Sequence, residues 1–138
     1  ITTDIMVGFP DETHSDFLES LHFAEKILFA KAHVFPYSIR EGTLAAKMDN
    51  QLTTEIKHDR CLKMIETTNK SRKIFLESQI GKTLSVLFEK FDKDKNTLIG
   101  YSKNYTPVII NTTKDLSRQI LDVKISSTDE YLCFGNLI

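Results

Sequence analysis

Two short loops hold the side chains with the most chemical potential in this 138-residue sequence. The first loop, Gly8 to Thr13, lies between a short apolar run and a helical pattern. The second, Tyr37 to Thr43, follows a strand-like run and contains an aromatic ring, hydroxyl groups and an arginine. A planar guanidinium binds carboxylates and phosphates with two parallel hydrogen bonds. The loops therefore predict a site for a flat or anionic ligand.

Each loop also has a purely structural interpretation. Gly8 lacks a Cβ, so a flat ligand could approach the backbone, and the helix that follows offers unpaired N–H groups to an anion. The alternative is that the glycine only shapes a tight turn. In the second loop Tyr37 can stack or donate a hydrogen bond, and Arg40 can orient an anion. The alternative for Arg40 is a surface ion pair with Glu41 or Asp11.

The elements that must position these loops read as strand, helix and strand. Thr3 to Phe9 is a continuous apolar run, which is typical of a strand buried on both faces in a parallel sheet. Thr13 can cap the following helix, with Asp16 three positions later in a variant of the capping box. A second strand is expected from Lys31 to Tyr37, joined by a right-handed crossover. One apolar face of the helix should lie on this sheet: Phe17, Leu21, Ala24 and Leu28.

The rest of the chain predicts a loop, a long helix and an all-β region. Ser38 to Gln51 is the loop, and Thr53 to Phe75 is a helix with a ragged apolar stripe, which suggests that it bridges two domains. Turn signals separate five β-favouring segments after it, which predicts a small antiparallel barrel of the OB type. These segments are Thr83 to Lys90, Thr97 to Ser102, Pro107 to Asn111, Ile120 to Ser126 and Glu130 to Leu137.

Composition limits the function classes. The stretch from Lys57 to Lys73 contains six basic residues and two acidic ones. Its positive charge could bind phosphates, although a solvated helix face explains it as well. No apolar run approaches the roughly 18 residues that a membrane span needs. We expect no membrane partner, and we take the cytoplasm as the default location. The chain opens without Met, which predicts a fragment of a longer protein.

The metal-ligating residues are scattered. Only two cysteines are present, Cys61 and Cys133, and neither has a cysteine or histidine partner close in sequence. None of the four histidines lies at the spacing of metal ligands from another histidine. We expect small packed cysteines and no metal ligand in this chain, and no Ser-His-Asp or phosphate-loop pattern is visible.

Several of these segments together resemble the radical S-adenosylmethionine (SAM) methylthiotransferases. The resemblance lies in Thr3 to Pro10, in His33 to Ser38 with the following Arg40, Glu41 to Thr43, and in Ala45 to Met48. The sequence from His33 to Ser38 most resembles the branch that acts on N6-threonylcarbamoyladenosine in tRNA. In the C-terminal region, Gly81 to Leu84, Gly100 to Tyr105 and Val123 to Ile125 resemble the family's TRAM domain, an OB-like RNA-binding module.

The resemblance implies a fold of the α/β plus all-β class. Residues 1–50 would be the terminal βαβ part of a TIM-like radical SAM barrel, residues 51–76 a bridging helix, and residues 77–138 the five-stranded TRAM barrel. The complete enzyme would use S-adenosylmethionine and two 4Fe-4S clusters to place a methylthio group on C2 of an adenosine beside the anticodon. Its partners would be the tRNA anticodon stem-loop, the rest of the radical SAM barrel and an N-terminal domain.

The resemblance also gives candidate site residues. Six residues at the strand ends would border the cofactor or substrate cavity: Gly8, Phe9, Pro10, Tyr37, Ser38 and Arg40. In the TRAM region Lys82 and Lys103 would meet phosphates, Asn104 would contact RNA, and Tyr105 would stack on an unpaired base. Tyr101 is a further possibility. Packing of both tyrosines in or near the barrel core is the alternative.

The sequence departs from the family pattern in three places. Asp11 stands where the family usually has Gly, and Ser117-Arg118 replaces a Gly expected before the fourth TRAM strand. The Cys-x3-Cys-x2-Cys motif that holds the radical-generating cluster is absent, as is the N-terminal domain. The fragment alone is therefore expected to bind no cluster and to be inactive. Two rivals remain: a stand-alone RNA-binding module, and a methylthiotransferase relative acting on another tRNA base or on a ribosomal protein.

Overall fold

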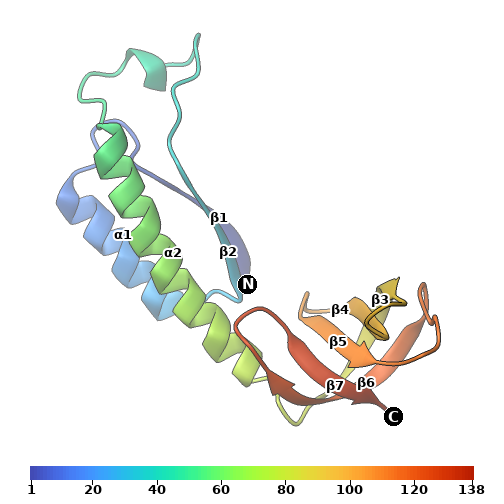
Figure 1. Ribbon diagram of the computed structural model, residues 1–138. Helices are drawn as coiled ribbons and strands as arrows, with labels where there is room; N and C mark the ends of the chain where they lie inside the picture. Colours follow the sequence, from blue (N-terminus) through green and yellow to red (C-terminus); the bar gives the residue numbers. More distant parts are fainter. The chain divides into compact units, whose positions relative to one another are not determined.

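The computed structural model describes residues 1–138, which divide into two compact units, Ile1–Arg72 and Lys73–Ile138. The first unit contains a two-stranded sheet and two helices, and the second contains five strands (Figure 1). No helix in the structure combines the length and apolarity that crossing a membrane requires.

The first unit is built on a parallel strand pair. Strand β1 (Thr2–Val7) pairs in parallel with β2 (Lys31–Pro36), and helix α1 (His14–Ile27) connects them. A 3-10 turn (Ala45–Lys47) lies in the loop that leads to helix α2 (Thr54–Glu77). The predicted strand, helix, strand and long helix are thus confirmed, with boundaries that differ by at most two residues.

The capping box predicted at the start of α1 is present. The Thr13 hydroxyl accepts a hydrogen bond from the Asp16 backbone N–H at 3.1 Å, and the Asp16 carboxylate accepts one from the Thr13 N–H at 2.9 Å. This arrangement satisfies two donors that the first turn of a helix otherwise leaves unpaired. At the other end, Leu28 adopts a left-handed conformation with φ of +57° and donates its N–H to the Ala24 carbonyl.

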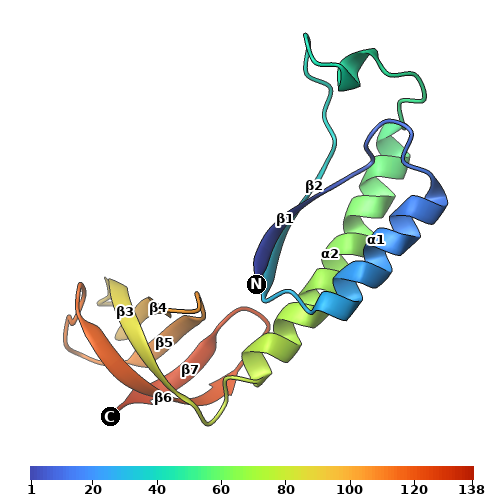
Figure 2. The same ribbon diagram turned by 180° about the vertical axis from the view of Figure 1, so that it is seen from behind.

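Both helices cover one face of the β1–β2 sheet (Figures 1 and 2). The buried cluster beneath them contains Val7 from β1, Phe17 and Ala24 from α1, Met64 from α2, and Phe29. The opposite face of the sheet is uncovered, and Met6 is exposed on it. The expectation of a strand buried on both faces was therefore wrong for this chain, because two strands with helices on a single side leave the other side open.

The second unit is a closed barrel in which every strand pairs on both sides. Its order is β3 (Thr83–Asp92), β4 (Thr97–Ser102), β5 (Pro107–Asn111), β7 (Cys133–Leu137) and β6 (Ile120–Thr128), and β6 returns to β3. All pairings are antiparallel except the parallel pair β5–β7. The predicted five-stranded barrel is confirmed (Figure 2).

The barrel interior is apolar and tightly packed. Val86, Phe88, Leu98 and Val108 are fully buried, and Leu76 from the last turn of α2 packs into the same cluster. Close packing also explains one glycine. A Cβ on Gly100 would lie 2.2 Å from the Leu87 carbonyl oxygen, so β3 and β4 can approach at this point only because the side chain is absent.

Candidate functional site

The two loops predicted to form a site begin at the same edge of the β1–β2 sheet. Val7 lies opposite Pro36 in the parallel register, so both strands end at the same level. The Tyr37 N–H donates to the Val7 carbonyl at 2.8 Å. The Phe9 ring meets the Tyr37 ring edge-on, with 5.3 Å between centroids and 69° between planes. The structure thus brings Gly8, Phe9 and Tyr37 together.

A partly buried ion pair fixes the shape of the first loop. One carboxylate oxygen of Glu12 accepts hydrogen bonds from the backbone N–H groups of Gly8, at 2.8 Å, and Phe9, at 3.4 Å. The other oxygen receives the guanidinium of Arg60 from α2, which also donates to the Glu12 carbonyl at 2.9 Å. Because charge-assisted hydrogen bonds are stronger than neutral ones, the Glu12–Arg60 pair locks the turn onto α2.

The structure supplies an internal reason for Gly8. Its φ is +74°, a region that favours glycine, and a Cβ there would lie 2.6 Å from Cγ of Lys57. Lys57 in turn holds its ammonium 5.2 Å from the centre of the Tyr37 ring. The space predicted for an approaching ligand is therefore occupied by a lysine stem, which supports the tight-turn explanation of this glycine.

The start of α1 is also occupied from within. The carboxylate of Asp16 accepts hydrogen bonds from the Thr13 hydroxyl and from the Thr13 N–H, and these bonds lower the pKa of Asp16. A negative charge at this position complements the helix dipole and disfavours a second anion. The anion predicted at this helix start would have to displace the capping box.

The remaining predicted cavity residues lie in different environments. Pro10 is buried, whereas Ser38 and Arg40 are exposed. Arg40 forms neither of the ion pairs considered for it. Asp11 instead accepts a 2.7 Å hydrogen bond from Asn50. The hydroxyl of Tyr37 is buried and has no hydrogen-bond partner, which leaves one polar atom at the strand ends open to a ligand or another segment.

Neither cysteine belongs to a cluster of ligands. Cys61 lies on α2 in the first unit, and Cys133 is buried in the second, where burial raises the pKa of its thiol. No group of three or more His, Cys, Asp or Glu side chains gathers in a geometry that could hold a metal. Iron–sulfur clusters need several thiolates, so the residues of this chain do not fit such a group.

Three of the six basic residues in the α2 stretch pair with carboxylates. Lys63 pairs with Asp59 at 2.7 Å and Lys70 with Glu66 at 2.8 Å, both one helical turn apart. Arg60 is committed to the Glu12–Arg60 pair. These contacts favour the solvated helix face over a phosphate-binding surface.

A second candidate site is a hollow of about 310 Å³ on the outer face of the barrel. Of the four residues predicted to contact RNA, Lys103 and Tyr105 line it, as does Tyr101, whereas Lys82 and Asn104 do not. Tyr101 and Tyr105 are 44% and 77% exposed, so neither packs in the barrel core. We call this surface the barrel hollow; its lining is Ser85, Leu87, Glu89, Tyr101, Ser102, Lys103, Tyr105 and Ile120.

Asn104 organises the loop that presents two of these residues. Its side-chain oxygen accepts hydrogen bonds from the Ser102 hydroxyl and from the Thr106 hydroxyl, the latter at 2.7 Å, and its NH₂ group donates to Gln79 at 3.3 Å. Tyr105 has a left-handed φ of +59° at the tip of this loop. An RNA-contacting role of Asn104 stays a prediction, while its observed contacts shape the loop.

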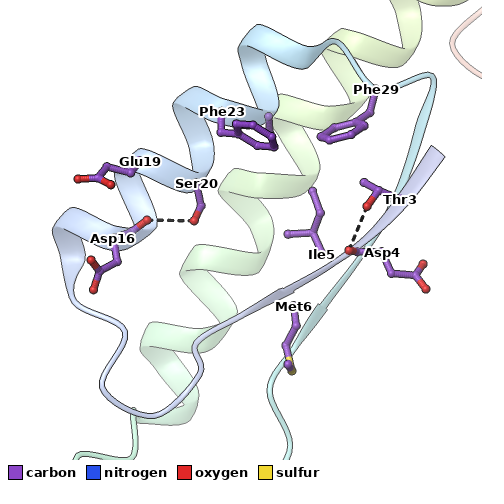
Figure 3. A pocket seen from close by; sticks show the side chains of 10 residues that line it. Thr3, Asp4, Ile5, Met6, Asp16, Glu19, Ser20, Phe23 and Phe29 are labelled. Atoms are coloured by element: carbon purple, nitrogen blue, oxygen red, sulfur yellow. Dashed lines mark hydrogen bonds between the residues drawn. The ribbon is translucent and has the colours of Figure 1, made fainter. Parts of the chain in front are cut away.

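A hollow of about 740 Å³ lies along β1 and α1 in the first unit (Figure 3). Its apolar lining includes Ile5, Phe23 and Phe29, and its polar lining includes Asp4 and Glu19. β1 pairs only with β2, so its other edge presents unpaired backbone groups. Acidic side chains beside an open strand edge suit another polypeptide segment better than a nucleic acid.

Sequence reasoning missed several residues of both sites. Glu12, Lys57 and Arg60 were not predicted as residues of the first site, although a glutamate two positions after the Gly8 to Pro10 turn could have indicated a carboxylate that folds back onto it. Leu87 was also missed, because β3 begins with a nearly continuous apolar run in which inward and outward positions look alike. Ile120 was missed because only the β3–β6 register brings it beside Leu87.

Comparison with known proteins identifies the barrel. The TRAM domain family matches residues 77–138. Residues 77–138 form a TRAM domain. The wider chain is similar to enzymes of tRNA modification. The threonylcarbamoyladenosine tRNA methylthiotransferase MtaB of Bacillus subtilis is 34% identical over 128 residues, which cover 91% of this chain and 28% of the relative.

Relatives with a different named substrate match equally well. The tRNA-2-methylthio-N(6)-dimethylallyladenosine synthase of Thermoanaerobacter sp. is 39% identical over 142 residues, covering 100% of this chain and 30% of the relative. The synthase of the same name from Wolbachia pipientis is 38% identical over 126 residues, 90% of this chain and 29% of that protein. The chain thus corresponds to less than one third of the length of these curated relatives.

Proposed function

We propose that this chain is part of a tRNA-modifying methylthiotransferase, which adds a methylthio group to C2 of N6-threonylcarbamoyladenosine next to the anticodon by radical SAM chemistry. The observation that carries the proposal is similarity over 91% and 100% of the chain to tRNA methylthiotransferases of two named substrates. The match of the TRAM family to residues 77–138 agrees with it.

The α/β unit would be the terminal βαβ part of the radical SAM barrel in this proposal. The open edge of β1, the uncovered face of the β1–β2 sheet and the hollow beside α1 all suit further strands and helices of the same protein. Those segments would bring the cluster-binding cysteines that this chain lacks. We accordingly expect the 138-residue chain alone to bind no cluster and to have no methylthiotransferase activity.

S-adenosylmethionine and two 4Fe-4S clusters would supply the radical chemistry of the complete enzyme. This chain would contribute the rim of the cavity. Phe9 and Tyr37 would offer apolar surface, Gly8 and Pro10 would shape the turn between strand and helix, and Ser38 and Arg40 would supply an exposed hydroxyl and a guanidinium for an anionic group. The Glu12–Arg60 pair supports this role because it holds the turn rigidly.

The assignment to threonylcarbamoyladenosine depends on His33 to Ser38, which end at the rim. The Bacillus subtilis relative carries this substrate in its name, and the dimethylallyladenosine enzymes are the competing branch. We further propose the tRNA anticodon stem-loop as the RNA partner and the cytoplasm as the location. Lys82, Lys103, Asn104 and Tyr105 remain the proposed RNA-contacting residues of the TRAM domain.

A stand-alone RNA-binding module is the second candidate. The observation that favours it is the closed barrel, which leaves no strand edge unpaired and so has no structural need of the α/β unit.

Analysis of tRNA nucleosides by mass spectrometry tests the proposal. Deletion of the gene that encodes this chain should abolish 2-methylthio-N6-threonylcarbamoyladenosine and leave the unmethylthiolated nucleoside in its place. Loss of the 2-methylthio-dimethylallyladenosine nucleoside instead would assign this chain to the dimethylallyladenosine branch. If both nucleosides persist unchanged, the stand-alone module becomes the better account.

A further inference from the structure

The barrel hollow is centred on one row of side chains that crosses three strands. Leu87 on β3 lies opposite Tyr101 on β4 in one ladder and opposite Ile120 on β6 in the other. All three point away from the barrel core and are 42%, 44% and 66% exposed. The outer face of an antiparallel sheet is ordinarily polar, so three large apolar side chains in one row mark an interaction surface.

The loop after β4 places further groups at this row. Tyr105 is among the most exposed aromatic side chains of the barrel, and its φ of +59° lies in the left-handed region that L-residues rarely adopt. The hydrogen bonds of Asn104 with Ser102 and Thr106 maintain this conformation. A protein that holds a tyrosine in water on a strained, well-anchored loop presents it to a partner.

The size and lining of the hollow fit one small flat group. A volume of about 310 Å³ is at the lower end of the range for ligand sites, which is roughly 300–1,000 Å³. Aromatic and branched aliphatic side chains can pack against the face of any nucleobase, because every base has a flat π-face. Lys103 lies in the lining, where an ammonium can meet the phosphate beside that base.

The polar lining adds a chemical preference. Glu89 lies at a bulge in β3, between Phe88 and Lys90, where the register with β4 shifts by one residue. Bulges re-aim a side chain, and here Glu89 is one of the residues that line the hollow. A carboxylate accepts hydrogen bonds and donates none, so it pairs with the exocyclic amino group of cytosine, adenine or guanine. Uracil has no amino group.

We propose that the barrel hollow binds a single unstacked, amino-bearing nucleobase of an RNA strand, with Tyr105 and the Tyr101–Leu87–Ile120 row on its faces and Glu89 at its amino edge. This inference rests on the proposed RNA-binding function and specifies the subsite and the base. Lys82 and Asn104 lie outside the hollow, so they are not part of it.

Binding of fluorescently labelled single-stranded RNA to the 138-residue chain tests the proposal. The probes are decamers of adenosine, cytidine and uridine, measured by anisotropy at constant salt. We expect the adenosine and cytidine strands to bind more tightly than the uridine strand. Tyr105→Ala should weaken their binding about fivefold or more, because loss of base stacking has an effect of this order. Ile120→Glu should weaken it further by placing a carboxylate near the phosphates.

Two variants serve as controls for position and for selectivity. Tyr131→Ala removes an exposed tyrosine of the β6–β7 turn outside the hollow and should leave the affinity unchanged. Glu89→Gln should bring the uridine strand closer to the other two. Circular dichroism of Tyr105→Ala and Ile120→Glu confirms folding, since both sites are well exposed.

The outcomes separate this inference from the proposed function. If the unaltered chain binds none of the three strands, both the RNA-binding function and the subsite fail. If it binds them, and Tyr105→Ala and Ile120→Glu bind equally well, the subsite is overturned while RNA binding stands. Equal affinity for uridine and cytidine strands would remove Glu89 as the reader of the base.

Discussion

The two units of this chain solve the problem of sheet edges in opposite ways. In the TRAM barrel each of five strands pairs on both sides, so no edge is left. In the α/β unit β1 and β2 pair only with each other, and one face of their sheet is uncovered. Closure satisfies backbone groups that an open sheet leaves to water or to another chain. One unit is thus structurally complete and the other is not.

The exposed apolar side chains show the same difference. In the barrel unit several of them gather around one hollow of small volume. In the α/β unit they are spread over the sheet face, the strand ends and α1, which is typical of a surface awaiting further elements. They include Met6, Phe9, Leu18, Phe23, Ile27 and Leu28, and further ones lie on α2, namely Ile56, Leu62 and Ile65.

The largest expected effect is a loss of barrel stability. Gly100→Ala would place a Cβ 2.7 Å from the Phe88 Cα and closer still to the Leu87 carbonyl oxygen, both backbone atoms that cannot move independently. We expect a loss of about 3 kcal/mol or more in the free energy of unfolding of residues 73–138. Urea unfolding followed by barrel resonances in NMR spectra measures it.

Gly81→Ala is the matched control for Gly100→Ala. Gly81 has a φ of +81° and no atom within 4 Å of its Cβ position, so only backbone strain of about 1 kcal/mol is expected. Equal effects of the two substitutions would show that the β3–β4 contact at Gly100 is not limiting.

The second effect is confined to the α/β unit. Arg60→Met removes the cation from the Glu12–Arg60 pair and leaves a largely buried carboxylate without its partner. We expect a loss of about 3 kcal/mol in the stability of that unit, and no change in the barrel. Faster amide exchange at Gly8 and Phe9, which donate to Glu12, would report the loosened turn.

Lys63→Met provides the comparison for Arg60→Met. Lys63 also forms an ion pair with a carboxylate, but both side chains are more than half exposed. Exposed pairs contribute about 0.2–1 kcal/mol, so the loss should be several times smaller. If Lys63→Met destabilises as much as Arg60→Met, burial is not what distinguishes the two pairs.

The third effect is a gain in stability when glycine replaces Asp11 or Arg118, the two positions where we expected glycine from the family resemblance. Asp11 and Arg118 have φ of +65° each, the left-handed region in which glycine has no Cβ penalty. Arg118→Gly should stabilise the barrel by about 0.5–1 kcal/mol in thermal unfolding. Asp11→Gly should gain less, because it loses the hydrogen bond from Asn50. A loss of stability in Arg118→Gly would contradict this explanation.

The smallest effect is a local dependence on pH at the start of α1. The pKa of Asp16 is lowered by its hydrogen bonds with Thr13, so the folded state holds its proton less tightly than the unfolded state does. The capping box therefore contributes above the ordinary pKa of an aspartate and is lost as pH falls through the lowered value. An NMR titration of the Thr13 amide should show this transition, and Asp16→Asn should remove it.

The pattern of elements could be predicted because local signals were unambiguous. Thr13 and Asp16 define a helix start by their chemistry and spacing, and β4 and β5 were predicted with the observed boundaries. The uncovered sheet face could not be predicted, because an apolar run indicates that a strand can be buried on both sides but not whether this chain supplies both covers.

The sites were less predictable because they depend on contacts between distant residues. Glu12 and Arg60 are 48 positions apart, and no periodicity links them. In the barrel, Tyr105 was predicted as a stacking residue from its type, whereas Leu87 and Ile120 became visible only through the strand register. Asn104 shows the reverse case, since its residue type suggested an RNA contact and the structure reveals three hydrogen-bond partners within the chain.

The central claim is that the TRAM barrel is complete and the α/β unit is not, and RNA affinity measured on the isolated barrel tests it most directly. Residues 73–138 should fold cooperatively and bind the cytidine decamer with a Kd within about twofold of the 138-residue chain, a difference of roughly 0.4 kcal/mol. A folded barrel that no longer binds RNA, while the 138-residue chain does, would contradict the account.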